Sequence, residues 1–230
     1  MTAAILLAIA LACLHAFLRG HGAVRVRHRF ARRAARQMLW FALPAIAGLA
    51  LLGRLDALIA LPREFVPARV ALATLLGGTL APADLARVTG IGILLGGLAV
   101  AWVERRWRRP FGLGDVETIL PRTRAELPWG VVLSLSAGIG EELFFRLLVP
   151  LLVAIPTGSA IAGFAIATAL FGGAHRYQGP VGIAATMLSG ALLTGAYLLT
   201  GALWVAIALH VAIDLNALVL RPVLSGRIRN

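Results

Sequence analysis

The chain has 230 residues, of which 60% are hydrophobic and 14% are charged, and its mean hydropathy is +0.87. Soluble domains are about half apolar and a quarter charged, so this composition predicts a polytopic membrane protein and excludes an ordinary soluble one. The net charge of +12 comes from arginines that fall between apolar runs. We therefore expect anionic lipid headgroups, and no nucleic acid, as partners of these cations.

The first apolar run, residues 1–18, contains the chain's one cysteine, Cys13. A single cysteine predicts neither a disulfide framework nor a cysteine-based metal site. The run lacks a basic start and a convincing small-residue cleavage site, so we expect a retained span rather than a signal peptide. The wealth of Ala, Leu, Gly and Arg, with no Lys, is typical of a GC-rich bacterial genome and suggests the bacterial inner (plasma) membrane.

Seven apolar runs approach the roughly 20 residues that a helix needs to cross a bilayer. They are residues 1–18, 38–61, 88–103, 128–156, 159–175, 179–201 and 202–224. The pattern predicts an all-α fold, a polytopic transmembrane helical bundle of about seven spans with short loops. A shorter apolar segment, residues 69–80, is expected to be interfacial or re-entrant.

Arginine placement predicts the orientation of these spans, because loops rich in Arg stay in the cytoplasm. The arginines concentrate in residues 19–37, in residues 104–127 and in the tail 225–230. Two crossings separate the first two segments, so both can lie on one side. We therefore expect the N-terminus outside and the C-terminus in the cytoplasm.

Charged side chains interrupt three of the later apolar runs. The motifs are Glu141-Glu142-Leu-Phe-Phe-Arg146, Phe171-Gly-Gly-Ala-His175 and His210-Val-Ala-Ile-Asp214. An ionisable group at bilayer depth costs about 3 kcal/mol or more, so such groups usually serve chemistry or transport.

The first motif contains two acids for one base. Glu142 and Arg146 lie four residues apart on one helix face, with the acid first, and are expected to pair. Glu141 is rotated about 100° from Glu142 and has no local counter-ion. The alternative is that both glutamates only neutralise Arg146 or a basic group on another helix.

Each histidine has a neighbour one helical turn away that can orient it. Phe171 offers an aromatic edge to His175, and Asp214 offers a carboxylate to His210. Taken singly, His175 is better explained as a satisfied interfacial group, whereas His210 with Asp214 is equally explained as an intramembrane hydrogen-bonded pair.

Taken together, one acid and two imidazoles on three helices are the components of a water-activating site or a metal site. Glu141 is a candidate general base. His210 and Asp214 are candidates for stabilising an oxyanion, although an ionised Asp only accepts hydrogen bonds, so Asp214 is either protonated or orients His210. Alternatively, Glu141, His175 and His210 would hold a divalent metal such as zinc and leave a fourth position for water. The His-Glu-x-x-His zinc motif is absent, so no cofactor is certain.

The three motifs follow the order Glu-Glu-x-x-x-Arg, Phe-x-x-x-His and His-x-x-x-Asn or Asp, each in its own apolar run. In this order they resemble the CAAX protease and bacteriocin-processing family of intramembrane proteases, also called CPBP or Abi. The resemblance covers about residues 128–216. It divides the chain into an N-terminal transmembrane and basic-loop region (1–127), a CPBP-like core (128–224) and a basic tail (225–230).

The resemblance implies a membrane endopeptidase that opens toward the cytoplasm and acts on a peptide or membrane-protein substrate. It implies that Glu141 and His175 activate water and that His210 and Asp214 form the oxyanion site. The third motif ends in Asp214, where eukaryotic CAAX-processing members have Asn. The resemblance gives structural roles to Glu142 and Arg146, while the orienting role of Phe171 rests on its spacing from His175.

The predicted spans place His175 near the cytoplasmic end of its helix and both Glu141 and His210 about 20 Å deeper. Such depths are incompatible with one site, so we expect a misplaced boundary in the run 159–175, corrected by a tilt or by continuing the helix through Tyr177. Two other functions use the same residues: a proton- or ion-coupled transporter and a catalytically inactive membrane scaffold.

Overall fold

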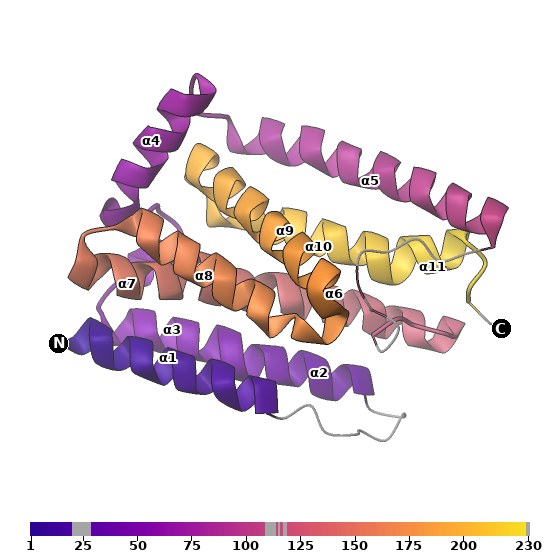
Figure 1. Cartoon of the computed structure of the whole chain (residues 1–230), viewed down its shortest axis with the longest axis horizontal. Helices are drawn as coiled ribbons and strands as arrows, with labels where there is room; N and C mark the ends of the chain where they lie inside the picture. The colour runs from indigo at the N-terminus through magenta and orange to yellow at the C-terminus, as the bar shows by residue number, and fades with distance from the viewer. Residues whose placement is uncertain (20–28, 109–113, 115, 117–118, 229–230) are drawn as a thin grey trace.

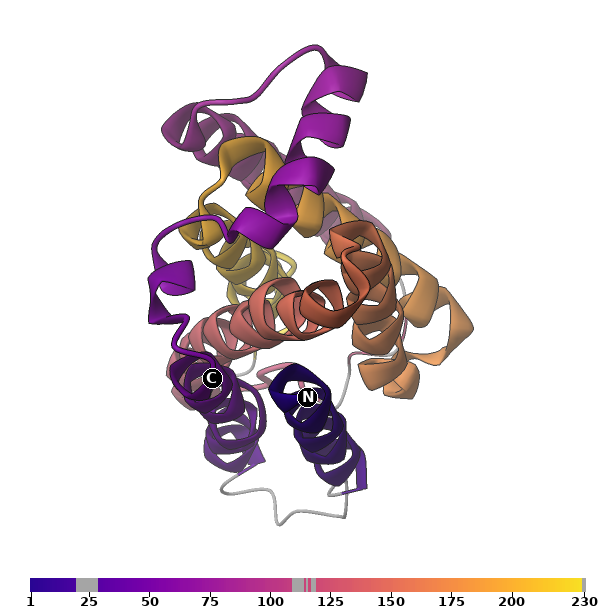
Figure 2. The same cartoon turned by 90° about the vertical axis from the view of Figure 1, so that its left-hand side faces the viewer.

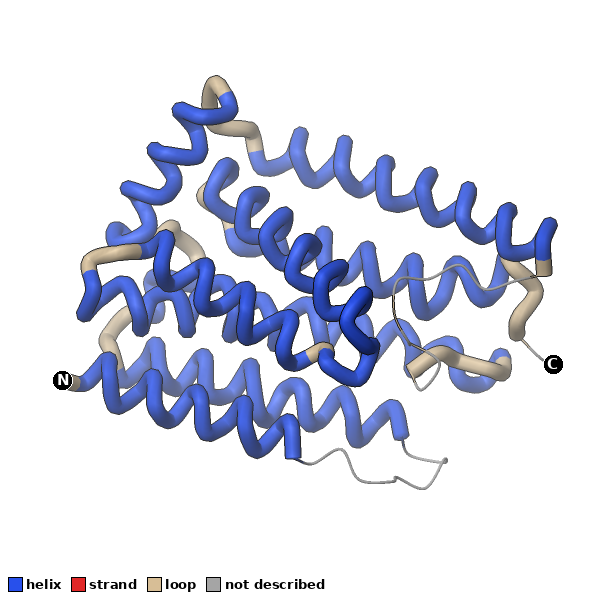
Figure 3. The backbone as a smooth tube through the Cα atoms, in the orientation of Figure 1, coloured by secondary structure: helices blue, strands red, loops and turns tan. Residues whose placement is uncertain are grey.

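A computed structural model of the chain describes residues 1–19, 29–108, 114, 116 and 119–228. Within these residues every regular element is a helix, as the tube in Figure 3 shows. The predicted all-α bundle is therefore confirmed. Several arginines of the predicted basic segments lie outside the described residues, namely Arg25, Arg27, Arg109 and Arg229.

Eleven α-helices occur in the described part of the chain. They are α1 (Thr2–Arg19), α2 (Arg29–Gln37), α3 (Leu43–Leu51), α4 (Val66–Leu76), α5 (Pro82–Trp107), α6 (Leu127–Glu142), α7 (Val149–Thr157), α8 (Ala160–Ala174), α9 (Gly179–Thr200), α10 (Leu203–Leu215) and α11 (Arg221–Leu224). Three π-helical turns join consecutive helices into longer rods. They are Met38–Ala42 between α2 and α3, Leu143–Leu148 between α6 and α7, and Asn216–Leu220 between α10 and α11.

Five helical segments of the described chain are long and apolar enough to cross a membrane. They are Thr2–Arg19, Arg29–Leu51, Pro82–Trp107, Arg176–Thr200 and Leu203–Leu224. The continuous run α6–α7 carries the charged first motif in its middle, and α8 is a shorter apolar helix. The chain is thus a membrane protein with several apolar helices.

The predicted boundaries of the second span, residues 38–61, are wrong. The helical segment runs from Arg29 to Leu51, so the last nine residues of the predicted basic loop 19–37 are helical. Arginine favours a helix and extends its charged end toward polar groups while its stem stays on the apolar surface. The helix stops early because Gly53 adopts a left-handed conformation, φ +66°, which is typical of a helix C-terminus.

The rod α6–α7 lies at the centre of the bundle (Figures 1 and 2). It packs against α1 and α2 on one side and against α8 and α10 on the other. Aromatic rings continue this packing across the core. Phe41 packs with tilted rings against Phe17 of α1 and against Phe145, which in turn lies edge-on to Phe171 of α8. The N-terminal helices are therefore joined to the later helices that carry the motifs.

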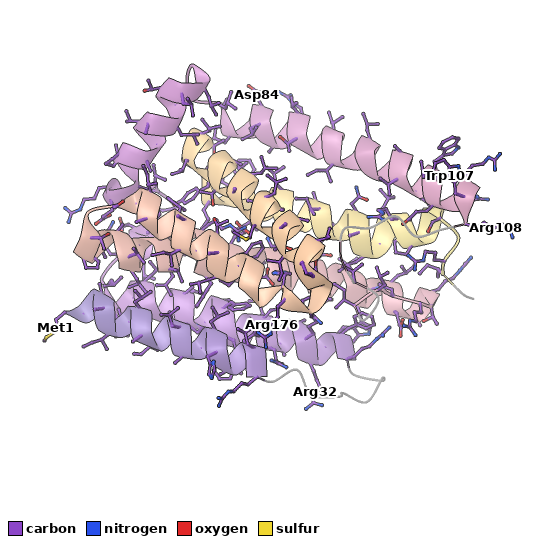
Figure 4. The ribbon with its side chains drawn as sticks, viewed as in Figure 1. Met1, Arg32, Asp84, Trp107, Arg108 and Arg176 are labelled. Atoms are coloured by element: carbon purple, nitrogen blue, oxygen red, sulfur yellow. The ribbon has the colours of Figure 1, made fainter. Side chains whose placement is uncertain are left out.

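The two ends of the bundle differ. Met1 lies at one end, whereas Trp107 and Arg108 lie at the other, as the labelled side chains in Figure 4 show. The last helix, α11, lies at the same end as the end of α5 (Figure 1). The start of α1 and the last helix, α11, therefore lie at opposite ends of the bundle.

An ion pair tightens the turn between α3 and α4. Both nitrogens Nη1 and Nη2 of Arg54 donate to Glu64, at 2.7 and 2.9 Å. Hydrogen bonding to this guanidinium lowers the pKa of the Glu64 carboxyl to about 2. This bidentate pair lies outside the candidate spans and outside the motifs.

Candidate active site

The first motif occupies the junction of α6 with the π-turn Leu143–Leu148. Glu142 is fully buried and Arg146 is 2% exposed. Arg146 Nη1 lies 3.0 Å from Glu142 Oε1, which is the pair that the four-residue spacing predicted. The guanidinium also lies 4.0 Å above the centre of the Phe171 ring, a cation–π contact that covers the charge where water is excluded. π-turns inside α-helices are frequent at functional sites.

Glu142 also binds His210, which the sequence reasoning did not predict. His210 Nδ1 lies 2.6 Å from Glu142 Oε1, so this oxygen contacts both Arg146 and His210. A carboxylate accepts hydrogen bonds and does not donate them, so Nδ1 carries the proton. The other ring nitrogen of His210, Nε2, is left to face Glu141 and Asp214.

His175 is oriented by the residue that the sequence indicated, but mainly through its backbone. His175 Nδ1 lies 2.9 Å from the carbonyl oxygen of Phe171, and a carbonyl accepts only, so Nδ1 is again the protonated nitrogen. The two rings meet edge-on at 4.8 Å between centroids. His175 therefore turns Nε2 toward Glu141, as His210 does.

Glu141 lies between these imidazoles and is 5% exposed. Its Oε2 atom is 4.0 Å from His175 Nε2 and 3.9 Å from His210 Nε2, which is beyond hydrogen-bond range. Oε2 is buried and has no hydrogen-bond partner among the described residues. The structure thus brings the three predicted residues together around one unbonded carboxylate oxygen.

Asp214 lies at the edge of this cluster and is more accessible. Its side chain is 28% exposed, and Oδ2 is 3.8 Å from His210 Nε2. The contact is electrostatic rather than a hydrogen bond. The expected pairing of His210 with Asp214 is therefore secondary to the hydrogen bond between His210 and Glu142.

Gln37, at the end of α2, is a site residue that the sequence reasoning missed. Its Nε2 donates to Glu141 Oε1 at 3.1 Å. A buried amide needs a hydrogen-bond partner, and Gln37 is one of only two glutamines in the chain. The rare glutamine was the signal available in the sequence. The sequence alone does not say which helix supplies the hydrogen-bond partner of its amide.

A cavity of about 110 Å³ opens beside these groups. Glu141, His175, His210 and Asp214 all line it, together with Gln37. Its volume exceeds what one water molecule requires. The cavity therefore has room for water beside the carboxylate and both imidazoles.

The expected difference in depth between the three residues is not present. The helix does not continue through Tyr177, because α8 ends at Ala174 and a 3₁₀ turn, Arg176–Gln178, leads into α9. The 15 residues of α8 extend about 22 Å, less than the roughly 30 Å hydrocarbon core. The short helix therefore brings His175, which directly follows it, beside Glu141.

The metal alternative does not fit the observed arrangement of Glu141, His175 and His210. Ligands about 2.0–2.1 Å from a tetrahedral zinc ion lie roughly 3.3 Å apart, whereas Glu141 Oε2 is 3.9 and 4.0 Å from the two Nε2 atoms. Within the described residues, no group of three His, Cys, Asp or Glu side chains is placed to hold an ion.

Comparison with known proteins places these residues in a family context. The family model described as type II CAAX prenyl endopeptidase Rce1-like matches residues 123–216. The match confirms the resemblance that the three motifs indicated, and it covers α6 to α10 but not α1 to α5. Neither a curated protein nor a solved structure matches the chain.

Proposed function

We propose that this chain is an intramembrane endopeptidase in which a Glu/His pair activates water. The premise is that residues 123–216 belong to the Rce1-like family of type II CAAX prenyl endopeptidases. The observation that carries the proposal is the position of Glu141 Oε2. It is a buried carboxylate oxygen that faces the Nε2 atoms of His175 and His210 at the edge of a cavity.

In the proposed reaction, water in the cavity gives a proton to Glu141 Oε2 while its oxygen attacks the carbonyl carbon of the scissile peptide bond. His175 supports this step because its Nδ1 is held by the Phe171 carbonyl, so Nε2 is free to accept a hydrogen bond from the same water. When the C–N bond breaks, protonated Glu141 returns the proton to the leaving amine. The products are one carboxylate and one amine.

His210 is the proposed donor to the oxyanion. Donation from Nε2 requires protons on both ring nitrogens, because Nδ1 already donates to Glu142. Glu142, with Asp214 3.8 Å from Nε2, supplies the negative charge that stabilises such a cation. In this scheme Asp214 orients and neutralises His210 and does not itself donate.

The proposed substrate is a peptide or a membrane protein whose cleaved segment enters at the arginine-rich end of the bundle. We assign that end to the cytoplasmic face of a bacterial inner membrane, with the N-terminus outside and anionic lipid headgroups around the arginines. The opposite positions of Met1 and Arg108 support this orientation (Figure 4). The restriction of the motifs to α6, α8 and α10 favours a protease over a transporter built from repeats.

Peptide profiling tests the proposal. The peptides that accumulate are compared between cells producing the wild-type protein and cells producing the Glu141→Gln variant. The Glu64→Gln variant, changed at the turn between α3 and α4, is the matched control. The candidate substrates are then tested for cleavage by the purified proteins in lipid. We expect cleavage products that are lost in the Glu141→Gln variant. The same products should still form in the Glu64→Gln variant and after treatment of the wild-type protein with a metal chelator. Turnover that survives Glu141→Gln would refute the general-base role, and turnover abolished by the chelator and restored by zinc would refute the metal-free mechanism.

A further inference from the structure

The helix α2 lies outside the family match, yet it reaches the candidate site. It packs along α6, and its last residue, Gln37, is 5% exposed. The close approach depends on Gly140, because a Cβ atom there would lie 3.2 Å from the Gln37 backbone oxygen. The residue directly before Glu141 is thus small where the N-terminal helix arrives.

The Gln37 amide is held between two groups on α6. Its Nε2 donates to Glu141 Oε1 at 3.1 Å, and its Oε1 accepts from the Ser136 hydroxyl at 2.9 Å. The single hydroxyl proton of Ser136 has a second acceptor, the Leu133 carbonyl oxygen at 3.0 Å. The carboxylate alone nevertheless fixes the amide orientation, because a flipped amide would set two acceptor oxygens against each other.

This contact distinguishes the two oxygens of the Glu141 carboxylate. Oε1 is occupied by Gln37, so rotation of the carboxylate is restrained and Oε2 is the atom that faces both imidazoles. Without the amide, a buried carboxylate would turn toward another donor or lose its defined orientation. A general base must hold the proton-accepting atom in a fixed position relative to water and substrate.

We propose that Gln37 is a positioning residue for the reaction, one that holds the Glu141 carboxylate with Oε2 toward the cavity. The inference rests on the proposed function, in which Glu141 is the general base. It assigns a part in the reaction to the N-terminal region, which the family match does not cover. Gln37 acts through Glu141 and needs no contact with the reacting atoms.

Kinetics of purified variants test the proposal. Gln37→Leu keeps similar volume but removes the donor, and we expect kcat to fall about ten- to a hundred-fold, the equivalent of one hydrogen bond to a charged group, with KM within about twofold. Ser136→Ala should lower kcat less. Its matched control is Ser134→Ala, whose hydroxyl donates to Gly130 within α6 and which should behave as wild type.

A pH profile separates positioning from a merely structural effect. In Gln37→Glu the introduced carboxyl group donates a hydrogen bond when protonated and repels Glu141 when ionised. The ratio of variant to wild-type kcat should therefore rise as the pH falls. Comparison with wild type at each pH removes the contribution of the other titratable groups that line the cavity, which are Arg33, Glu141, His175, Tyr177, His210 and Asp214.

Infrared spectroscopy gives a readout that does not depend on turnover. The carboxylate stretching band of Glu141, identified by its loss in Glu141→Gln, should shift in Gln37→Leu. An unchanged band, or wild-type kcat in a folded Gln37→Leu protein, would overturn the positioning role while leaving the proposed function intact. If the band shifts in Gln37→Leu but the wild-type protein cleaves no peptide, the hydrogen bond between Gln37 and Glu141 would be supported and the proposed function refuted instead.

Discussion

The two halves of the molecule contribute to the site in different ways. The later helices α6, α8 and α10 supply Glu141, His175 and His210, and they lie within the family match. The earlier helices supply Gln37 and part of the cavity wall, and they lie outside it. The groups proposed to do the chemistry are thus carried on one region, and one of them, Glu141, is also hydrogen-bonded by the other region through Gln37.

The largest expected effect comes from removing the proposed base in the later half. Glu141→Gln keeps the shape of the side chain and its contact with α2 but cannot accept a proton at the same position. We expect kcat to fall about 10²- to 10⁴-fold, measured by cleavage of an identified peptide. The exposed Asp84→Asn on α5 is the matched control, and equal losses in both variants would contradict a specific role for Glu141.

Breaking the buried ion pair should affect folding most. Arg146→Met leaves Glu142 buried with His210 as its remaining partner, so we expect the free energy of unfolding to fall by about 3–5 kcal/mol. Unfolding in mixed detergent micelles measures it. Arg87→Met on α5, where the side chain is 68% exposed, should change little, and similar stability of the two variants would show that the Glu142–Arg146 pair is dispensable.

Separating the two halves sharpens the comparison further. Gly140→Ala places a methyl group 3.2 Å from the Gln37 backbone oxygen and should cost about 1–3 kcal/mol of stability through overpacking, together with part of kcat. Gly96→Ala meets no atom within 4 Å and should be neutral in the same thermal unfolding and cleavage assays. A neutral Gly140→Ala would mean that α2 need not lie so close to α6.

The smallest effect is expected at the turn between α3 and α4, far from the motifs. The pKa of Glu64 is lowered to about 2 from an ordinary value of about 4.3. Its pairing with Arg54 therefore stabilises the fold fully above pH ~4.3, and the contribution is lost as the pH falls toward 2. Thermal unfolding should show a stability difference between wild type and Glu64→Gln that shrinks over this range, with turnover at neutral pH unchanged. A difference independent of pH would exclude this ion pair as its cause.

Local spacing predicted much of the later half. Apolar runs indicated the helices, and the four-residue spacings placed Glu142 beside Arg146 and His175 beside Phe171. These relations hold because residues four apart share one helix face, whatever the surrounding fold. The family resemblance rested on the same motifs, and it is confirmed for residues 123–216.

What the sequence did not predict depends on contacts between distant segments or on where helices end. The hydrogen bonds of Gln37 with Glu141 and of Glu142 with His210 join residues on different helices, and no periodicity encodes such partners. The run 159–175 predicted α8 to within one residue at each end, but it did not show that His175, directly after this helix, lies beside Glu141. The helical start at Arg29 was hidden by arginines, which favour a loop by charge and a helix by propensity.

The central claim is that Glu141 activates water for peptide-bond hydrolysis. It is tested most directly by cleavage of an identified substrate in H₂¹⁸O, with mass spectrometry of the products. One ¹⁸O atom should appear in the new C-terminal carboxylate with the wild-type protein, and product formation should be lost with Glu141→Gln. Cleavage without ¹⁸O incorporation, or labelled product formed equally fast by folded Glu141→Gln, would contradict it.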